Sequence, residues 1–298
     1  PTRRSSDLSA RLVEEWGIEG DAHVGKWHRQ VSMLSFEKIE AFREKGADVD
    51  FGAFGENLVV EGFDLSKVPV GTKFQIGEAI LELTQIGKEC HSHCAIYKVM
   101  GDCIMPREGV FTRVLKGGEI KAGDEITMLP LEKDRPFTAA IITLSDKGAA
   151  GEREDKSGPL IQEMLMKEGY DVIETLLLPD GEQPLKHQLM RLADQRQVNV
   201  IFTTGGTGFA ERDVTPEATQ AVCDRMAMGI ADAIRQYSLS ITGRAMLSRA
   251  VSGIRKKTLI VNLPGSPKAV KESLEYVLPH LGHGLGILRG TDGECGNS

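Results

Sequence analysis

The spacing of hydrophobic residues changes near residue 130 and divides the chain into two parts. In residues 79–85 apolar and polar side chains alternate, which predicts a half-exposed strand. Residues 137–144 instead form a continuous apolar run, which is typical of a strand buried in a parallel sheet. The segment 131–136 is polar and bordered by prolines, and it predicts a linker. We therefore predict one domain over residues 1–130, a second over residues 137–290 and a tail over residues 291–298.

The first part contains short strands at close spacing, separated by turns that contain glycine. A helix is predicted over residues 36–45 and ends at Gly46. The predicted strands lie at residues 31–34, 79–85, 111–115 and 125–128, and a turn followed by a strand is predicted within residues 54–60 and again within residues 70–77. Many short strands with little helix favour a mainly-β barrel.

The second part alternates strands with helices. The strands are predicted at residues 137–144, 170–178, 198–202 and 258–263, and helices at residues 184–195 and from Ser157, Thr215 and Ser266 onward. This alternation predicts an α/β domain with a mostly parallel sheet covered by helices on both faces.

The third of these strands leads into a glycine-rich loop, Gly205-Gly206-Thr207-Gly208. After a charged segment, Thr215 is predicted to cap the next helix, with Pro216 at its first position. A loop between a strand and a helix N-terminus presents backbone N–H groups to an anion. Glycines also serve ordinary strand-to-helix turns, so the loop alone leaves both interpretations open.

The carboxyl ends of the predicted strands all carry polar or glycine residues, and ligands of parallel sheets bind at that edge. The residues there are Ser145, Asp146, Asp180, the 205–208 loop, Asp213 and Pro264-Gly265-Ser266. Helix capping explains one or two of them, and Asp180 is also explained as a turn residue before Gly181. Two acids beside a phosphate-type loop, Asp180 and Asp213, favour Mg²⁺, which takes one or two carboxylates plus substrate phosphates.

Composition narrows the classes of partner. The chain has 298 residues, which predicts about two domains, and its net charge of −7 argues against broad nucleic-acid or membrane-surface binding. No apolar run approaches the ~20 residues of a membrane span. The five cysteines are odd in number and three lie close together, which favours a reducing cytoplasm over a disulfide framework. The chain starts at Pro1 with a polar, patternless segment, so we expect a missing or replaced N-terminus and the loss of an opening strand.

The first domain carries a dense group of cysteines and histidines: Cys90, His91, His93, Cys94 and Cys103. Three thiols and one imidazole would complete a zinc tetrahedron. Alternatively, neighbouring positive charge would lower the pKa of one thiol from ~8.5 and make it reactive. Free cysteines also serve as small buried hydrophobes.

This domain resembles the MOSC domain of molybdenum-cofactor sulfurases over about residues 17–128. The resemblance rests on Gly20-Asp21-Ala22-His23, Phe54-Gly55-Glu56-Asn57-Leu58, the cysteine at Cys90 and the segment from Val114 to Asp124. It implies a β-barrel in which Cys90 ligates molybdenum or carries sulfur, and a domain that binds or transfers metal, sulfur or finished cofactor. A family association with pyridoxal phosphate follows as well. Glu89 stands where the family often has proline, and Cys94 and Cys103 are additional.

The second domain resembles the MogA/MoaB family over about residues 137–290. The matching motifs include Leu178-Pro179-Asp180, the 203–208 loop, Arg212-Asp213-Val214-Thr215-Pro216-Glu217, Ser248-Arg249 and Asn262-Leu263-Pro264-Gly265-Ser266-Pro267. The resemblance implies molybdopterin adenylyltransferase activity, in which Mg²⁺, ATP and molybdopterin give adenylylated molybdopterin and pyrophosphate. It also implies that Asp180 and Asp213 are needed for catalysis, and that family members often form trimers.

The predicted site therefore has a catalytic and Mg²⁺-binding pair, Asp180 and Asp213, and a larger set of substrate-binding residues. That set is Ser145, Asp146, Gly205, Gly206, Thr207, Gly208, Arg212, Thr215, Pro264, Gly265 and Ser266, with Arg249 as a further phosphate partner. The favoured hypothesis is a cytoplasmic, homo-oligomeric enzyme fusion of molybdenum-cofactor synthesis. A non-catalytic cofactor carrier and a zinc-stabilised regulatory module remain alternatives.

Overall fold

The computed structural model describes residues 9–90 and 94–291, and it separates into two compact units. The first unit ends at Glu132 and the second begins at Lys133, within the segment predicted as a linker. Each unit has its own hydrophobic core. His91, His93 and almost all of the predicted tail lie outside the described residues. None of the described helices is long and apolar enough to cross a membrane.

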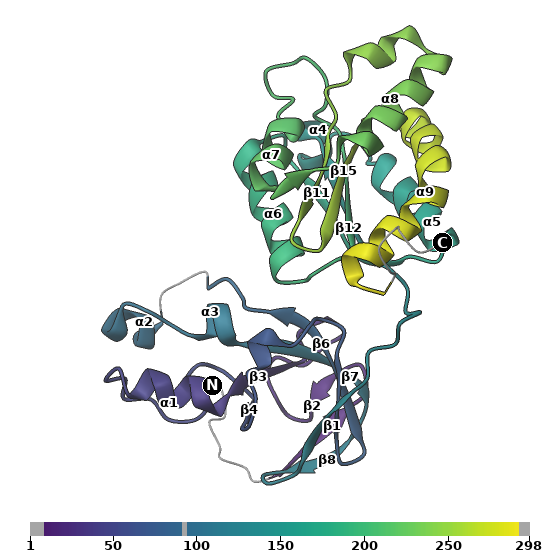
Figure 1. Cartoon of the computed structure of the whole chain (residues 1–298). Helices are drawn as coiled ribbons and strands as arrows, with labels where there is room; N and C mark the ends of the chain where they lie inside the picture. The colour runs from purple at the N-terminus through teal and green to yellow at the C-terminus, as the bar shows by residue number, and fades with distance from the viewer. Residues whose placement is uncertain (1–8, 91–93, 292–298) are drawn as a thin grey trace. The chain divides into compact units, whose positions relative to one another are not determined.

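The first unit is rich in β-structure. One sheet has three strands in the order β2-β1-β8, and the other has six in the order β4-β3-β7-β6-β5-β9. The larger sheet curls as half of a barrel (Figure 1), and closure into a full barrel stays a prediction. The strands are β1 (Ser9–Val13), β2 (Gly17–Ile18), β3 (Val31–Ser35), β4 (Leu58–Val60), β5 (Lys73–Ile76), β6 (Ala79–Ile86), β7 (Val110–Lys116), β8 (Gly118–Lys121) and β9 (Ile126–Leu129).

Short helices accompany these sheets: α1 (Phe36–Arg43), η1 (Leu65–Lys67), α2 (Ala95–Met100) and α3 (Met105–Glu108). The helix predicted over residues 36–45 is confirmed and ends two residues earlier. Ile39 and Phe42 of α1 pack with Phe54, Cys103 and Phe111 in a core of their own. The alternation in residues 79–85 is confirmed as well, because inward and outward residues of β6 alternate in burial along its length.

The second unit is built on a six-stranded sheet in the order β11-β10-β12-β15-β14-β13 (Figure 1). The first four strands pair in parallel, and the last two are antiparallel. The strands are β10 (Thr138–Leu144), β11 (Asp171–Leu178), β12 (Val200–Thr204), β13 (Arg225–Met226), β14 (Ser252–Arg255) and β15 (Thr258–Leu263). The predicted mostly parallel sheet is confirmed, but the strand predicted over residues 198–202 in fact extends to Thr204. Thr203 and Thr204 are both buried.

Helices cover both faces of this sheet, as predicted. Successive residues of β10 alternate between the two cores: Ala139 and Ile141 face α5 and α9, whereas Ala140 and Ile142 face α6 and α7. The helices are α4 (Asp146–Ala149), α5 (Ser157–Lys167), α6 (Glu182–Asp194), α7 (Thr215–Val222), α8 (Met228–Ile241), η2 (Gly243–Leu247) and α9 (Pro267–Arg289). Helix α8 and the antiparallel strands β13 and β14 were not predicted from the sequence.

A buried polar contact ties the central strands to the helix after the glycine loop. Asn262 of β15 is fully buried, and its amide nitrogen donates to the hydroxyls of Thr203 and Thr219, at 2.9 Å each. Its amide oxygen accepts the backbone N–H of Val251 at 3.2 Å. One side chain therefore joins β15, β12, α7 and the segment before β14.

Replacing Asn262 by alanine removes three buried hydrogen bonds, those to the hydroxyls of Thr203 and Thr219 and to the N–H of Val251. We expect Asn262→Ala to lower the free energy of unfolding by about 3 kcal/mol. Urea unfolding followed by circular dichroism measures this. Ser240→Ala, which removes an exposed hydroxyl that donates to the backbone of Tyr237, is the control and should change stability by less than about 0.5 kcal/mol. A loss below 1 kcal/mol for Asn262→Ala would contradict the role of this contact.

Candidate active site

A cavity of about 700 Å³ lies at the carboxyl edge of the parallel strands, and we call it the main cavity. It gathers residues that follow β10, β11, β12 and β15. The predicted residues that line it are Ser145, Asp146, Asp180, Gly205, Gly206, Arg212, Asp213, Gly265 and Ser266. Four other predicted residues do not line the cavity: Thr207, Gly208, Thr215 and Pro264. Their hydrogen bonds show how the backbone of the cavity walls is fixed.

The glycine loop is possible only with glycine at its first two positions. Gly205 and Gly206 have φ angles of 99° and 63°, in the left-handed region that other residues rarely adopt. A Cβ on Gly205 would also overlap the carbonyl oxygen of Leu144, and one on Gly206 would overlap the hydroxyl of Thr215. The loop backbone is therefore pressed directly against the end of β10 and the start of α7.

Thr215 is not the cap of α7, contrary to the sequence prediction. Val214 occupies the cap position, Thr215 is the first helical residue and Pro216 the second. The Thr215 hydroxyl donates to the carbonyl of Gly205 at 2.9 Å, and its N–H donates to the carbonyl of Gly206 at 3.1 Å. Because Thr215 is buried and committed to these bonds, it fixes the loop.

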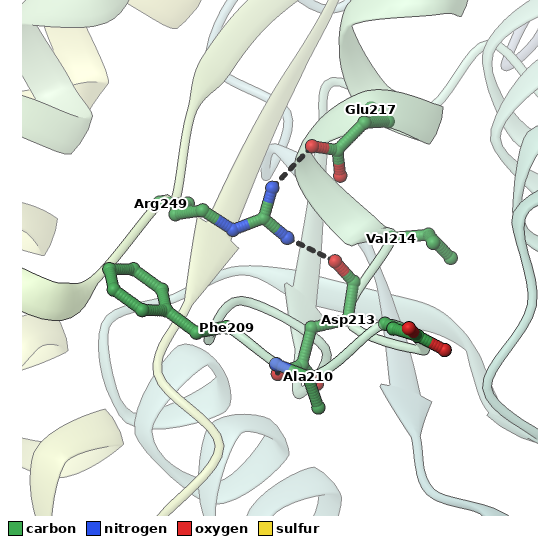
Figure 2. A pocket seen from close by; sticks show the side chains of 7 residues that line it. Phe209, Ala210, Asp213, Val214, Glu217 and Arg249 are labelled. Atoms are coloured by element: carbon green, nitrogen blue, oxygen red, sulfur yellow. Dashed lines mark hydrogen bonds and ion pairs between the residues drawn. The ribbon is translucent and has the colours of Figure 1, made fainter.

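Arg249 holds the other end of the loop. Its backbone N–H donates to Thr207 at 3.0 Å and its Nε to the carbonyl of Gly208 at 2.6 Å. Its two terminal nitrogens bind the carbonyl of Asp213 and the carboxylate of Glu217 (Figure 2). All three guanidinium nitrogens thus bind protein acceptors and Arg249 fixes the loop, while its role as a phosphate partner stays a prediction.

Two acids at this edge, Asp146 and Asp180, each accept a hydrogen bond from the backbone N–H of the other. The N–H of Asp146 donates to the carboxylate of Asp180 at 3.2 Å, and the N–H of Asp180 donates to the carboxylate of Asp146 at 2.9 Å. Burial raises the pKa of Asp180, and the charges of Asp146 and Asp213 raise it further, against the lowering effects of the Asp146 N–H and of Arg212. The site therefore concentrates negative charge that a cation would relieve.

The carboxylates fit a cation that arrives with a phosphate. Among residues 9–90 and 94–291, no three histidine, cysteine or acidic side chains are grouped closely enough to bind a metal ion by themselves. Mg²⁺ commonly takes only one or two protein carboxylates and completes its shell with substrate phosphates and water. Asp180 and Asp213, both in the wall of the main cavity, supply that kind of donor set.

Sequence reasoning missed the basic residues of the main cavity. Lys147, Arg153 and Lys156 line it, and Arg153 donates to the hydroxyl of Ser145 at 3.1 Å. These residues lie in the segment after β10, which the sequence predicted only as a polar loop. The segment holds as many acids as basic residues, and no fixed spacing marks its basic residues as ligands, so no signal in the sequence could have identified them.

In the first unit, Cys90 and Cys94 are exposed, whereas Cys103 is buried. Burial raises the pKa of the Cys103 thiol, which fits the small-hydrophobe interpretation for that residue. The zinc hypothesis depends on His91 or His93, which lie outside the described residues. The reactive-thiol and zinc hypotheses for Cys90 and Cys94 stay predictions.

An open, mostly parallel sheet with a glycine loop, paired acids and a polar cavity at its carboxyl edge is typical of α/β domains that bind ligands at that edge. Residues 140–283 match the family described as the probable molybdopterin binding domain, and residues 20–127 match the MOSC domain.

The curated relatives of the second unit include molybdopterin adenylyltransferases. The molybdopterin adenylyltransferase of Haemophilus influenzae is 45% identical over 139 residues, which cover 46% of this chain and 71% of the relative. That of Helicobacter pylori is 39% identical over 153 residues, which cover 51% of this chain and 87% of the relative. The crystal structure of the molybdopterin biosynthesis enzyme MoaB from Thermus thermophilus matches with 46% identity and a TM-score of 0.50, over 52% of this chain and 97% of that one. The chain belongs to the MogA/MoaB molybdopterin adenylyltransferase family, here fused to a MOSC domain.

The raised pKa of Asp180 has a consequence for stability. Above that pKa the folded protein carries a carboxylate that its surroundings disfavour relative to the unfolded chain, so Asp180→Asn should raise the free energy of unfolding at neutral pH. Because Asp180 is partly exposed, we expect only a few tenths of a kcal/mol. The gain should vanish as the pH falls through the raised pKa, where the native carboxyl is already neutral.

Urea unfolding between pH 4 and pH 8 checks this prediction. Asp171→Asn, at an exposed position at the start of β11, serves as the control. A variant that is less stable than the parent at pH 7 and more stable at pH 4 would have the opposite sign and would refute the electrostatic account.

Proposed function

We propose that the second unit transfers the adenylyl group of Mg-ATP to the phosphate of molybdopterin, a step in molybdenum cofactor biosynthesis. The observation that carries the proposal is the meeting of the glycine loop, Asp180 and Asp213 at one edge of the sheet. Two adenylyltransferases that are 39% and 45% identical to this chain support it.

The reaction joins two anions. A phosphate oxygen of molybdopterin attacks the α-phosphorus of ATP, a new P–O bond forms, and the bond to the β-phosphate breaks and releases pyrophosphate. Positioning and charge neutralisation therefore supply most of the catalysis. Bound Mg²⁺ would neutralise the charge that develops on the phosphate oxygens.

The residues divide these tasks. Backbone N–H groups of the 205–208 loop hold a phosphate, and Asp180 and Asp213 hold the cation. Arg212 lies in the same cavity wall and offers a positive charge to the phosphates. The pterin end of the cavity is shaped by Ser145, Asp146 and the 264–266 turn. The basic side chains of the 147–156 segment, Lys147, Arg153 and Lys156, line the same cavity.

The MOSC unit binds or transfers the metal, the sulfur or the finished cofactor through Cys90. Cys90 is exposed, as a residue that exchanges a ligand must be. We place the whole chain in the cytoplasm as a homo-oligomer, trimeric as the family resemblance implies. Binding of pyridoxal phosphate has no support from the site geometry and stays a prediction.

The second candidate function is a non-catalytic carrier of molybdopterin. The same cavity would bind the pterin, but a carrier has no use for a carboxylate such as Asp180, whose pKa is raised by burial and by the charges of Asp146 and Asp213. The presence of both acids therefore favours the enzyme.

The full chain, incubated with molybdopterin and Mg-ATP, should form adenylylated molybdopterin, detected by mass spectrometry. We expect Asp213→Asn to lower the rate by about 100-fold or more, because the cation loses a ligand at the reacting phosphates, and EDTA to abolish it. Asp232→Asn, which breaks an exposed ion pair with Arg235 on α8, should leave the rate unchanged. Normal turnover by Asp213→Asn would refute its role, and molybdopterin binding without any product would favour the carrier.

Metal analysis tests the MOSC unit. The full chain loaded with molybdenum cofactor should retain about one molybdenum per chain, and Cys90→Ser should lose it because the anchoring thiolate is gone. Cys223→Ser, at a partly buried thiol of the second unit, is the control. One zinc per chain in place of molybdenum would instead support the zinc-stabilised module.

A further inference from the structure

One arginine joins helix α8 to the segment that holds the glycine loop. Arg235 lies in the middle of α8, and its Nε donates to the carbonyl of Ser248 at 3.2 Å. Its Nη2 donates to the carbonyl of Ala250 at 2.8 Å. The residue between these two acceptors is Arg249, which fixes the loop. Arg235 therefore holds the backbone on both sides of the residue that positions the loop.

The segment from Ser248 to Ala250 uses its two edges for different partners. Ser248 is extended, with φ of −75° and ψ of 124°. In extended backbone the carbonyls of alternate residues point to one edge, and the N–H of the residue between them points to the other. The two carbonyls accordingly meet α8, whereas the N–H of Arg249 donates to the carbonyl of Thr207 in the loop at 3.0 Å. A displacement at the α8 edge of this segment therefore reaches the loop at the other edge.

These two carbonyls require a guanidinium group. Ala250 is only 3% exposed, so water does not readily replace the bond to its carbonyl. Nε and Nη2 of Arg235 form one edge of a planar, rigid group that binds two carbonyls at once, whereas the single nitrogen of a lysine lacks this fork. The third nitrogen, Nη1, makes an ion pair with Asp232, whose side chain is 61% exposed. Because exposed ion pairs contribute little, the two carbonyl bonds are the contacts through which Arg235 acts.

The N-terminal end of α8 is attached to the same region of the chain by a separate contact. Ser252 is fully buried, and its hydroxyl donates to the carbonyl of Ala227 at 2.5 Å and accepts the N–H of Ala231 at 3.1 Å. The N–H of Ala227 donates to the carbonyl of Ser252 at 2.9 Å. Because these bonds keep α8 in place, a change at Arg235 alters the support of the 248–250 segment without releasing the helix.

We infer that Arg235 is a positioning residue of the second unit. Through Arg249 it fixes the glycine loop and the backbone at Asp213 in the arrangement that adenylyl transfer needs. This inference rests on the proposed adenylyl transfer and adds a residue that does not line the main cavity and acts on it through the main chain. A misplacement of ~1 Å in groups that position substrates lowers a rate by up to about 100-fold, so support from outside the cavity affects turnover.

The kcat for adenylylated molybdopterin, measured with the full chain at saturating molybdopterin and Mg-ATP, tests the inference. We expect Arg235→Lys to lower kcat by about tenfold, because the carbonyls beside Arg249 lose the fork that holds them. Thermal unfolding followed by circular dichroism establishes that the variant is folded at the assay temperature. Two controls should keep the parent kcat: Arg244→Lys, at an exposed arginine of η2, and Asp232→Asn, which leaves both carbonyl bonds in place.

A double-mutant cycle shows whether Arg235 acts through Arg249. We expect Arg249→Lys to lower kcat by about 100-fold, because the loop loses its direct contacts. The variant that carries both changes should match Arg249→Lys within a factor of two, because the change at Arg235 then removes support from a connection that is already broken. Effects that multiply, to a loss of about 1,000-fold, would mean that Arg235 acts independently of Arg249 and would overturn the inference.

Hydrogen–deuterium exchange supplies a measurement that needs no substrate. Amides of residues 205–214 should exchange about tenfold faster in Arg235→Lys than in the parent, whereas amides of β10 should not change. Unchanged exchange together with unchanged kcat would overturn the inference and leave the adenylyl transfer standing. A parent protein that forms no adenylylated molybdopterin would refute the proposed function, and the exchange rates would then still decide whether Arg235 fixes the loop.

Discussion

The second unit depends on the close approach of the glycine loop to the end of strand β10. Gly205 lies against the carbonyl oxygen of Leu144, a place that admits no side chain, and both Gly205 and Gly206 are in the left-handed region. The approach turns the backbone away from the sheet just above its carboxyl edge. Loop N–H groups and the acids after β10 and β11 can therefore face one cavity.

The surrounding contacts keep this backbone in place. Thr215 binds the carbonyls of Gly205 and Gly206, Arg249 binds the carbonyl of Gly208, and Asn262 joins the strands below to α7. These side chains bind the protein's own main chain, and they act on the site by fixing its walls. The residues of the sequence motifs therefore have two different roles. Some line the cavity, and others form hydrogen bonds that keep the backbone of its walls in place.

The sequence predicted the architecture well where the periodicity was strong. The alternation of strand and helix patterns identified the four parallel strands, and the polar ends of those strands identified the site edge, because strand direction alone brings these ends together. The antiparallel pair β13–β14 was missed because its strands are only two and four residues long. Helix α8 was missed because its sequence carries no Ser, Thr, Asp or Asn cap ahead of Met228 and no Gly directly after Ile241.

Side-chain roles were harder to predict than positions, and Thr215 and Arg249 show why. A threonine before a proline is a typical helix cap, yet the Thr215 hydroxyl donates to the carbonyl of Gly205 at 2.9 Å and Val214 occupies the cap position. An arginine near a phosphate loop is a typical phosphate ligand, and the sequence did not show that Arg249 also binds three protein acceptors and so holds the loop. Both outcomes depend on a loop path that only the folded backbone defines.

The charged residues that line the main cavity favour one kind of ligand. Burial there raises the pKa of Asp180, and the negative charges of Asp146 and Asp213 raise it further. Lys147, Arg153 and Lys156 line the same cavity, in a segment that also contributes the acids Asp146, Glu154 and Asp155, so both signs of charge line the cavity side by side. A ligand that carries only one sign would be repelled by half of this surface. A metal-bound phosphate presents both signs at once, and it relieves the repulsion among the acids while it binds the bases.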